Sequence, residues 1–342
     1  MRIVVARILI VTIMACIGSK PSTALSTLTK KSTALDVLTH LNQSNQLASF
    51  VHSGGVAVVT GGNSGIGAVS VKTLALSGMK VILCARNVEA AQQTKESLEP
   101  YCQELVDIQE LDLADLSSVE TASKAIIAKY GRIDLLLNNA GVMAMPKKQY
   151  TEQGMERQFG TNHVGHHFFT RSLLPHLNPH GRVVTVASTA HTFVTGPTID
   201  WEPEKYAPWG AYGASKLANI LFAKKLQDLF QEQGRSDLTS ISLHPGVIGT
   251  SLWRFMPWFV QPLKGLFADK TIDQGAATNV FCSLSKDITP GAYYSDCQVK
   301  DPTSTAQNEA VRNQLWDYTE RLIAKNGFNM PEKLVAEQVT VK

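Results

Sequence analysis

The chain has 342 residues, of which 44% are hydrophobic and 18% are charged, and its 32 basic and 29 acidic residues give a formal net charge of +3. This length and hydrophobic content suffice for a full-sized core and exclude a disordered chain. Five cysteines, an odd number without a Cys-x-x-Cys pair, exclude a disulfide-bonded scaffold and a zinc ribbon.

The positive charge is concentrated at the start of the chain. Residues 1–35 hold five basic residues and no Asp or Glu, which leaves 27 basic against 29 acidic residues, a net charge of −2, in residues 36–342. A body with this charge gives no global reason to expect a nucleic-acid partner. We therefore expect no nucleic-acid binding and interpret the basic start as a targeting signal.

The leader has two parts of different composition. Residues 3–17 are apolar apart from Arg7 and Thr12, and small residues follow. This stretch is shorter than the roughly 20 residues that span a bilayer. Residues 1–18 are therefore predicted to be a signal peptide or a signal anchor, and the Ser/Thr-rich residues 19–50 a transit-like segment and linker.

Two destinations fit such a leader. A signal followed by a transit-like segment is typical of proteins sent to plastids bounded by extra membranes. An uncleaved anchor in the endoplasmic reticulum membrane, followed by a polar linker, fits equally well. Both locations stay open at this point.

The body alternates between strands and helices. Apolar runs rich in β-branched residues predict seven strands, at residues 56–60, 81–85, 107–111, 133–138, 182–187, 238–243 and 292–294. Helices are predicted after the first strand to about residue 76 and at residues 116–130, 154–174 and 211–233, the second of these opened by a capping box of Ser117 and Glu120. Nearly all-apolar strands between helices indicate a parallel sheet covered on both faces. We predict one α/β domain with a doubly wound, seven-stranded sheet over residues 51–325, and a tail over 326–342.

A glycine-rich loop follows the first strand. Residues 60–67 read TGGNSGIG, with the spacing GxxxGxG. Such a loop makes a tight turn, lets a pyrophosphate approach the backbone and points a helix N-terminus at it. The predicted dinucleotide contacts are Gly61, Asn63, Ser64, Gly65, Ile66 and Gly67.

The end of the second strand bears on the choice of cofactor. Proteins that bind NAD usually place an acid about 20 residues after the loop, where it accepts the ribose hydroxyls. This chain has Ala85 there, followed by Arg86. A guanidinium favours the 2′-phosphate, so we predict NADP(H). The alternative is that Arg86 is a surface arginine at a strand end.

Further blocks follow in order along the chain. They are Asn138-Asn139-Ala140-Gly141, Asn162-His163, Ser188, Tyr212-x-x-x-Lys216 and His244-Pro245-Gly246. Together with the glycine loop, over about residues 53–300, they resemble the short-chain dehydrogenase/reductase family and most of all its retinol-dehydrogenase-like branch. Protochlorophyllide reductases and plastid-envelope import-associated dehydrogenases have similar blocks. One departure is Ala187, where this branch often has a second serine. The resemblance implies a Rossmann fold.

The resemblance also implies a catalytic set of Asn162, Ser188, Tyr212 and Lys216. Tyr212 is the expected acid/base, but an unperturbed tyrosine pKa of ~10 is too high for a base near neutrality. Lys216 lies four residues on, on the same helix face. Its charge, with that of oxidised nicotinamide, is expected to favour the phenolate. Ser188 is expected to bind the substrate oxygen, and Asn162 to hold a water that links Lys216 to solvent.

The remaining cofactor contacts are assigned by position in the family pattern. Asp112 is expected at the adenine, Asn139, Ala140 and Gly141 at the adenosine ribose, and Pro245, Gly246 and Thr250 at the nicotinamide, with Tyr212 and Lys216 also touching the cofactor. No metal is expected, because the cluster of His163, His166 and His167 has no glutamate placed as in HExxH and fits packing beside the site. The cysteines Cys84, Cys102, Cys282 and Cys297 are expected to be buried and reduced.

The substrate side is expected to be apolar. Residues 251–267 are rich in aromatic side chains and follow Pro245-Gly246, where the family places a mobile lid, here about residues 247–270. Such a lid suits a large apolar aldehyde, ketone or alcohol. Trp201 and Trp209, in an insertion before Tyr212, are predicted to wall the same pocket.

These features predict an NADP(H)-dependent oxidoreductase that interconverts a carbonyl and an alcohol on an apolar, retinal-like or other substrate. Two alternatives remain. One is a protochlorophyllide-type reductase in a plastid, and the other is a non-catalytic, NADPH-sensing module at an organelle membrane. Membrane association through the leader and lid, and a homo-oligomeric state, stay open.

Overall fold

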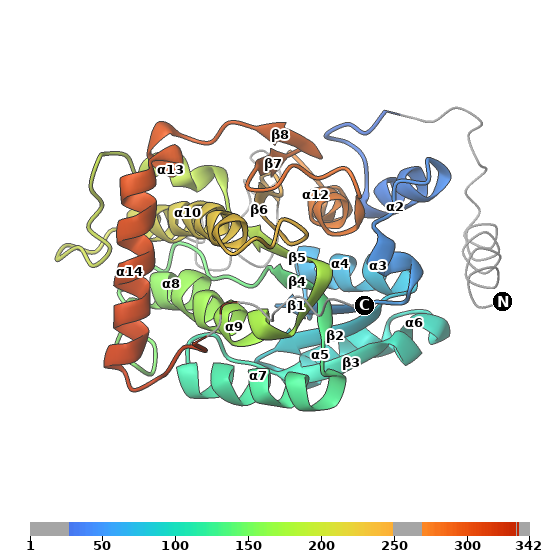
Figure 1. Cartoon of the computed structure of the whole chain (residues 1–342), viewed down its shortest axis with the longest axis horizontal. Helices are drawn as coiled ribbons and strands as arrows, with labels where there is room; N and C mark the ends of the chain where they lie inside the picture. The colour runs from blue at the N-terminus through green and yellow to red at the C-terminus, as the bar shows by residue number, and fades with distance from the viewer. Residues whose placement is uncertain (1–26, 249–268, 333, 335–342) are drawn as a thin grey trace.

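The computed structural model describes residues 27–248, 269–332 and 334 (Figure 1). The predicted signal at residues 1–18, most of the predicted lid and Thr250 lie outside the described residues. Within the described part of the chain, no helix is long and apolar enough to cross a membrane.

One eight-stranded sheet runs through the molecule in the order β3-β2-β1-β4-β5-β6-β7-β8. The strands are β1 Val56–Thr60, β2 Lys80–Ala85, β3 Val106–Glu110, β4 Ile133–Asn138, β5 Leu177–Val186, β6 Thr239–His244, β7 Tyr293–Ser295 and β8 Gln298–Lys300. The strands from β3 to β7 pair in parallel, and β8 pairs antiparallel with β7. The doubly wound Rossmann-type fold is thus confirmed. The eighth strand escaped prediction because its three residues are all exposed and carry no apolar alternation.

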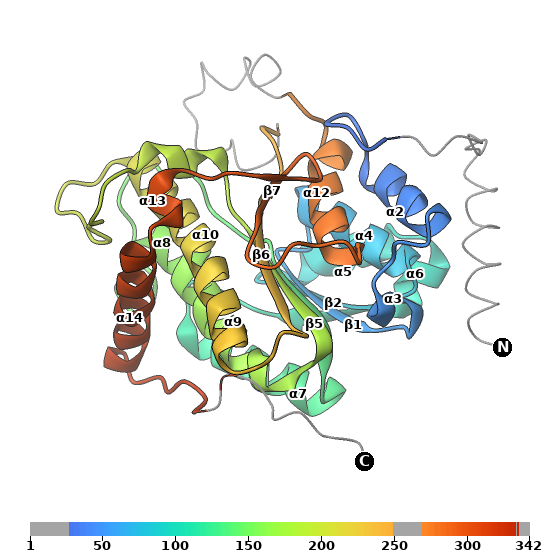
Figure 2. The same cartoon turned by 45° about the horizontal axis from the view of Figure 1, so that its top comes forward.

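Helices cover both faces of the sheet (Figures 1 and 2). Successive β1 residues point to opposite faces, so Val58 belongs to one core cluster while Ala57 and Val59 belong to the other. The first face carries α7 Leu116–Tyr130, α9 Gly165–Leu173, α10 Pro208–Glu232 and α14 Glu309–Lys325, and the second carries α2 Ala34–Gln43, α4 Gly65–Leu76 and α12 Ile272–Leu284. Shorter helices are α3 Ser49–His52, α5 Val88–Glu96, α6 Pro100–Leu105, α8 Arg157–Phe159, the π-helix η1 Gly160–Val164, η2 Leu174–His176, η3 Thr189–Phe193 and α13 Ser304–Gln307.

The strand order reverses between β1 and β4, because the chain first winds outward to β3 and then returns to β4 on the other side of β1. In open parallel sheets this switch point leaves a crevice at the carboxyl ends of the strands. The glycine loop after β1 and the Asn139 loop after β4 both begin there.

Helices α2 and α3 lie within residues 34–52, although residues 19–50 were expected to be a transit-like segment and linker. A capping box of Thr33 and Asp36 begins α2, and Val37, Leu38 and Leu41 are buried against the body. The Ser/Thr-rich composition of the leader masked this amphipathic helix.

Several predicted ends also differ from the structure. Helix α7 is capped by Asp115, whose side chain accepts from the Ser117 N–H, rather than by the predicted Ser117–Glu120 box. The segment after α14, predicted as a loose tail, begins with packed residues, since the Phe328 ring lies 5.5 Å from that of Phe168 and Leu334 is buried.

Candidate active site

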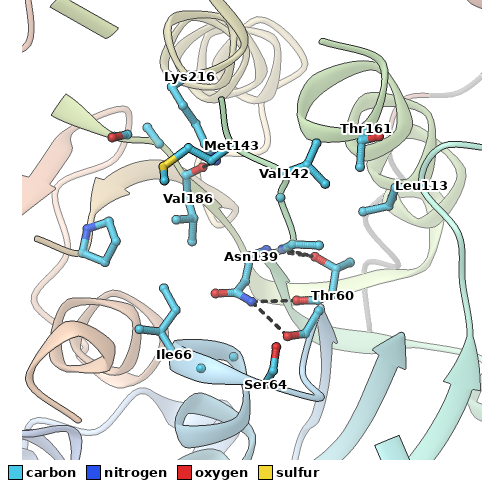
Figure 3. A pocket seen from close by; sticks show the side chains of 18 of the residues that line it. Thr60, Ser64, Ile66, Leu113, Asn139, Val142, Met143, Thr161, Val186 and Lys216 are labelled. Carbon is cyan, nitrogen blue, oxygen red and sulfur yellow. Dashed lines mark hydrogen bonds between the residues drawn. The ribbon is translucent and has the colours of Figure 1, made fainter. Parts of the chain in front are cut away.

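A cavity of about 730 Å³ lies at the carboxyl ends of the strands around the switch point (Figure 3). Nearly all of the predicted site residues line it, from loops that are far apart in the sequence. They are Gly61, Asn63, Ser64, Gly65, Ile66, Gly67, Arg86, Asp112, Asn139, Ala140, Gly141, Ser188, Tyr212, Lys216, Pro245 and Gly246. Asn162 does not line the cavity and lies behind its wall.

The glycine loop is built by close backbone contact. A Cβ on Gly67 would lie 2.2 Å from the Gly61 carbonyl oxygen and 2.6 Å from Asn139 Nδ2, so no side chain fits. Gly61 and Gly65 have φ values of +64° and +53°, a region that L side chains rarely adopt. Ser64, the N-cap of α4, makes no side-chain cap bond, so the N–H groups at this helix end remain available to an anion. These residues fit a dinucleotide pyrophosphate.

Thr60, the last residue of β1, joins the two loops at the switch point. Its hydroxyl oxygen accepts the N–H groups of Asn139 at 2.9 Å and Ala140 at 3.0 Å. Asn139 Nδ2 donates in turn to the Thr60 carbonyl at 2.8 Å (Figure 3). Our sequence reasoning missed this residue, although a hydroxyl at the end of a buried strand is a polar group that needs partners.

Arg86 follows β2 directly and lines the cavity where the sequence pattern predicts the adenosine. Its side chain is 61% exposed, and Nη1 lies 3.7 Å from the carboxylate of Asp112. It is therefore a surface arginine that also lines the cavity. The pairing holds the guanidinium beside the position where the ribose of a dinucleotide is expected.

The Tyr212 phenol and the Lys216 ammonium reach the cavity from the first half of α10. Both side chains are buried. Lys216 Nζ donates to the Val186 carbonyl at 3.0 Å and lies 5.8 Å from the centroid of the Tyr212 ring. The lysine is thus close to the phenol but is held by the end of β5.

Burial governs the protonation of this pair. It raises the pKa of Tyr212 to about 12, although a hydrogen bond with Ser188 works in the opposite direction. It also lowers the pKa of Lys216 to about 8. We expected Lys216, with oxidised nicotinamide, to favour the phenolate. In the structure, burial is the largest cause of the Tyr212 pKa shift, and the phenol stays protonated at neutral pH.

Asn162 lies in the π-helix η1 and is fully buried. Its Oδ1 accepts the Val142 N–H at 2.8 Å, and its Nδ2 donates to the Val142 carbonyl and to Ser215 Oγ, each at 2.9 Å. A Cβ on Gly141 would lie 3.2 Å from Asn162 Oδ1 and 3.6 Å from Lys216 Nζ, so both side chains lie close to Gly141. The amide therefore clamps the loop after β4 to α10 beside Lys216.

The three histidines beside Asn162 bond to protein groups. His163 Nε2 lies 3.0 Å from Thr319 Oγ1, His166 Nε2 lies 2.8 Å from Thr60 Oγ1, and His167 Nε2 lies 2.9 Å from Glu320 Oε1. Burial lowers the pKa of each imidazole. No cluster of metal-ligating side chains occurs in the part of the chain that the structure describes. The four cysteines within it are buried free thiols, as predicted.

The opposite end of the cavity is aromatic. Phe193 and Trp209 line it and are 60% and 41% exposed. The Trp209 ring lies 6.2 Å, centroid to centroid, from both Phe193 and Tyr212 and is nearly perpendicular to each. Trp201, which we also predicted here, is instead buried and stacked on Phe159 at 5.7 Å. The prediction for Trp201 was therefore wrong, because its side chain is buried in the core against Phe159 of α8.

Known proteins match most of the chain. A family model described as short chain dehydrogenase matches residues 55–257. Short-chain dehydrogenase TIC 32 B, chloroplastic, of Brassica napus is 38% identical over 283 residues, which cover 78% of this chain and 88% of that protein. Retinol dehydrogenase 11 of Homo sapiens is 37% identical over 273 residues, covering 77% and 84%. A crystal structure of an uncharacterised protein from Mycobacterium paratuberculosis has a TM-score of 0.66 at 30% identity and covers 88% of this chain and 99% of its own.

Proposed function

Because the chain belongs to the short-chain dehydrogenase family, oxidoreductases that bind a nicotinamide dinucleotide, we propose that it is an NADP(H)-dependent reductase of apolar aldehydes or ketones. The reaction would be reversible, with the corresponding alcohol as product. The observation that carries this proposal is a protonated, buried Tyr212 beside Lys216 and Ser188 in one cavity with the glycine loop.

The bound dinucleotide would supply a hydride, with its two electrons, to the carbonyl carbon. On the protein side, the glycine loop and the N-terminus of α4 would hold the pyrophosphate. Lys216 would bind the nicotinamide ribose. These contacts would orient the transferable hydrogen toward the end of the cavity that Tyr212 lines.

Tyr212 would act as the acid of the reduction. Its pKa of about 12 keeps the proton on the phenol at neutral pH. As the C–H bond forms and the C=O π bond breaks, the phenolic proton would pass to the oxygen, which Ser188 would hold by a hydrogen bond. The Lys216 ammonium would stabilise the resulting phenolate, and solvent would return the proton through the water proposed at Asn162.

The choice of NADP(H) rests on Arg86. Its guanidinium lines the adenosine end of the cavity, and no carboxylate stands at position 85. Asp112 pairs with Arg86 at 3.7 Å. A 2′-phosphate would accept hydrogen bonds from this guanidinium, whereas the ribose of NAD, which has no phosphate, would leave Arg86 without a partner on the cofactor.

The substrate is proposed to be apolar because Phe193 and Trp209 line the cavity near Tyr212. Aromatic walls favour large hydrophobic groups over small polar ones. The relative retinol dehydrogenase 11, by its name, acts on retinol, which is a large apolar alcohol. That likeness supports the apolar class and does not identify the compound.

The proposal is tested by NADPH consumption with a panel of aldehydes and ketones. We expect turnover in the dark, which Tyr212→Phe lowers by roughly 10²–10⁴-fold, the usual contribution of a general acid, while NADPH still binds. Retained turnover in the variant would contradict the role of Tyr212 as the acid. Light-dependent reduction of added protochlorophyllide, without turnover of the panel, would indicate the protochlorophyllide-type reaction, and NADPH binding without any turnover would indicate the sensing module.

We propose a plastid as the location. The relative from Brassica napus is named as chloroplastic, and residues 19–35 are rich in Ser and Thr without acidic residues. The N-terminal residue of the mature protein tests this proposal, because a plastid protein would begin well after residue 18. An uncut N-terminus would favour the membrane anchor instead.

A further inference from the structure

His166 lies on α9 directly behind the catalytic wall, and the proposed function gives it no role. Its ring is fully buried, yet both ring nitrogens have partners. Nε2 lies 2.8 Å from Thr60 Oγ1, and Nδ1 lies 2.9 Å from the main-chain carbonyl oxygen of Asn162. The imidazole thus joins the end of β1 to the π-helix η1.

The partners fix where the ring proton is. A carbonyl oxygen can only accept, so Nδ1 must carry the proton that it donates to Asn162. A neutral imidazole then has an unprotonated Nε2, which accepts from the Thr60 hydroxyl. Burial, helped by the positive charge of Lys216, lowers the pKa of His166 to about 4, so the ring is neutral at neutral pH.

The Thr60 hydroxyl fits this assignment independently. A hydroxyl offers one donor and two acceptor sites. The N–H groups of Asn139 and Ala140 occupy both acceptor sites. The proton of Thr60 is therefore left for His166, because the other acceptor in reach, the Leu137 carbonyl, is more distant at 3.5 Å. The partners of the imidazole and the partners of the hydroxyl thus lead to the same result: Thr60 donates the bond and His166 Nε2 accepts it.

The Asn162 carbonyl that bonds to His166 belongs to the π-helical turn η1. In a π-helical turn the backbone bonds skip one residue further than in an α-helix, and such turns occur frequently at functional sites. The Gly165 N–H, for example, donates to the Gly160 carbonyl. The Asn162 carbonyl lies inside this turn, and a side-chain donor from His166 fixes its direction.

We propose that His166 is a positioning residue, which holds the Asn162 carbonyl in the orientation that the proton relay to Lys216 requires and ties it to the dinucleotide loops through Thr60. This inference rests on the proposed function. Hydrogen bonds then run without a break from Asn139 to Thr60, from Thr60 to His166 and from His166 to Asn162. The relay geometry and the dinucleotide site are then held by the same buried groups.

Two substitutions separate the two bonds of the ring. In His166→Asn, the amide nitrogen takes nearly the place of Nδ1 and can still donate to Asn162, whereas the bond to Thr60 is lost. In His166→Gln, the amide reaches the place of Nε2 and can accept from Thr60, whereas the bond to Asn162 is lost. We expect kcat to stay within about twofold of wild type in the Asn variant and to fall roughly tenfold in the Gln variant. NADPH affinity should fall in the Asn variant, which loses the bond to Thr60, and be retained in the Gln variant.

Two further measurements distinguish a positioning role of His166 from a role in packing alone. The pH profile of kcat should shift in the Gln variant alone. His163→Asn, a control on the neighbouring turn that loses a bond to Thr319, should lower the melting temperature without changing kcat or its pH profile. Equal losses in the Asn and Gln variants, or full kcat in the Gln variant, would overturn the proposal.

The tautomer is measured without substrate. Nitrogen chemical shifts of ¹⁵N-labelled histidine, with the signal of His166 identified from its absence in the Gln variant, should show a protonated Nδ1 and an unprotonated Nε2 between pH 5 and 8. A protonated Nε2 would overturn the assignment. A wild-type protein that reduces no carbonyl would instead contradict the proposed function, and this spectrum would still decide the direction of the two bonds.

Discussion

The two ends of the cavity are built in different ways. At the dinucleotide end, close backbone contacts and the buried Thr60 hydroxyl fix the shape of the two loops. A Cβ on Gly67 would clash with the Gly61 carbonyl oxygen at 2.2 Å. At the substrate end, exposed side chains make the wall, chiefly Phe193 and Trp209. The first end tolerates almost no change in shape, whereas the second can vary by substitution of side chains that little else depends on.

This difference explains why the cofactor is readable from the sequence and the substrate is not. Backbone contacts demand glycine at fixed spacings, so the residue type reports the geometry. A side-chain wall can be made by many apolar residues in several positions. It follows that substitutions at the dinucleotide end should have the larger effects.

Among substitutions at the two ends, the largest effect is expected for Gly67→Ala. The added methyl group would push the loop away from the Gly61 carbonyl, and overpacking that costs about 3 kcal/mol corresponds to roughly 100-fold weaker NADPH binding. Fluorescence titration with NADPH measures this loss. Gly210→Ala is the matched control, because its Cβ would make only an ordinary contact at 3.4 Å with Ala207. Equal affinity in the two variants would contradict a backbone-built site.

The next effect concerns the reacting residues between the two ends. Burial lowers the pKa of Lys216 to about 8, so this lysine is charged below pH 8 and neutral above it. Reduction consumes a proton, and we expect kcat for reduction to fall up to tenfold per pH unit as the pH rises past about 8.

The Lys216→Arg variant tests whether deprotonation of Lys216 causes this decline, because a guanidinium keeps its charge at high pH. Whatever activity the variant retains should no longer decline near pH 8. Lys225→Arg, on the same helix but outside the cavity, should leave the decline where it is in the wild type. A decline near pH 8 that persists in Lys216→Arg would show that another group sets it.

A smaller effect is expected for Arg86→Ala. The guanidinium is 61% exposed, so its bond to a 2′-phosphate should contribute near the lower end of the about 1.5–3 kcal/mol typical of charged hydrogen bonds. The ratio of kcat/KM with NADPH to that with NADH should then fall roughly tenfold. Arg132→Ala, an exposed arginine away from the cavity, is the control. An unchanged ratio would refute the assignment of NADP(H).

Much of the fold was predictable for a physical reason. Parallel strands buried on both faces read as continuous apolar runs, and β1 and β4 have the predicted bounds. Strand β5 begins at Leu177, five residues before the predicted start, because Asn178, Pro179 and His180 interrupt its apolar pattern. His180 has a φ of +64°, a conformation that no strand pattern would indicate.

The sequence predicted those site residues that belong to recognisable motifs. Residues with a fixed chemical task, such as Tyr212, Lys216 and the loop glycines, occur at spacings that a helix or turn imposes. Thr60 and His166 were missed because their roles depend on contacts across 106 positions of the sequence. The sequence also could not tell Trp201 from Trp209, since both lie in one insertion and only packing decides which faces the cavity.

The smallest effect is expected at the aromatic wall. Trp209→Ala would remove ring contacts that contribute about 0.5–1.5 kcal/mol, so KM for a large apolar aldehyde should rise roughly three- to tenfold, with KM for NADPH unchanged. A short aliphatic aldehyde, which cannot reach both rings, should lose less. Tyr150→Ala, which removes an aromatic ring that is 55% exposed outside the cavity, serves as control. If KM for NADPH rose together with KM for the aldehyde, the two ends would be one coupled site, and the division between a rigid backbone end and a variable side-chain end would not hold.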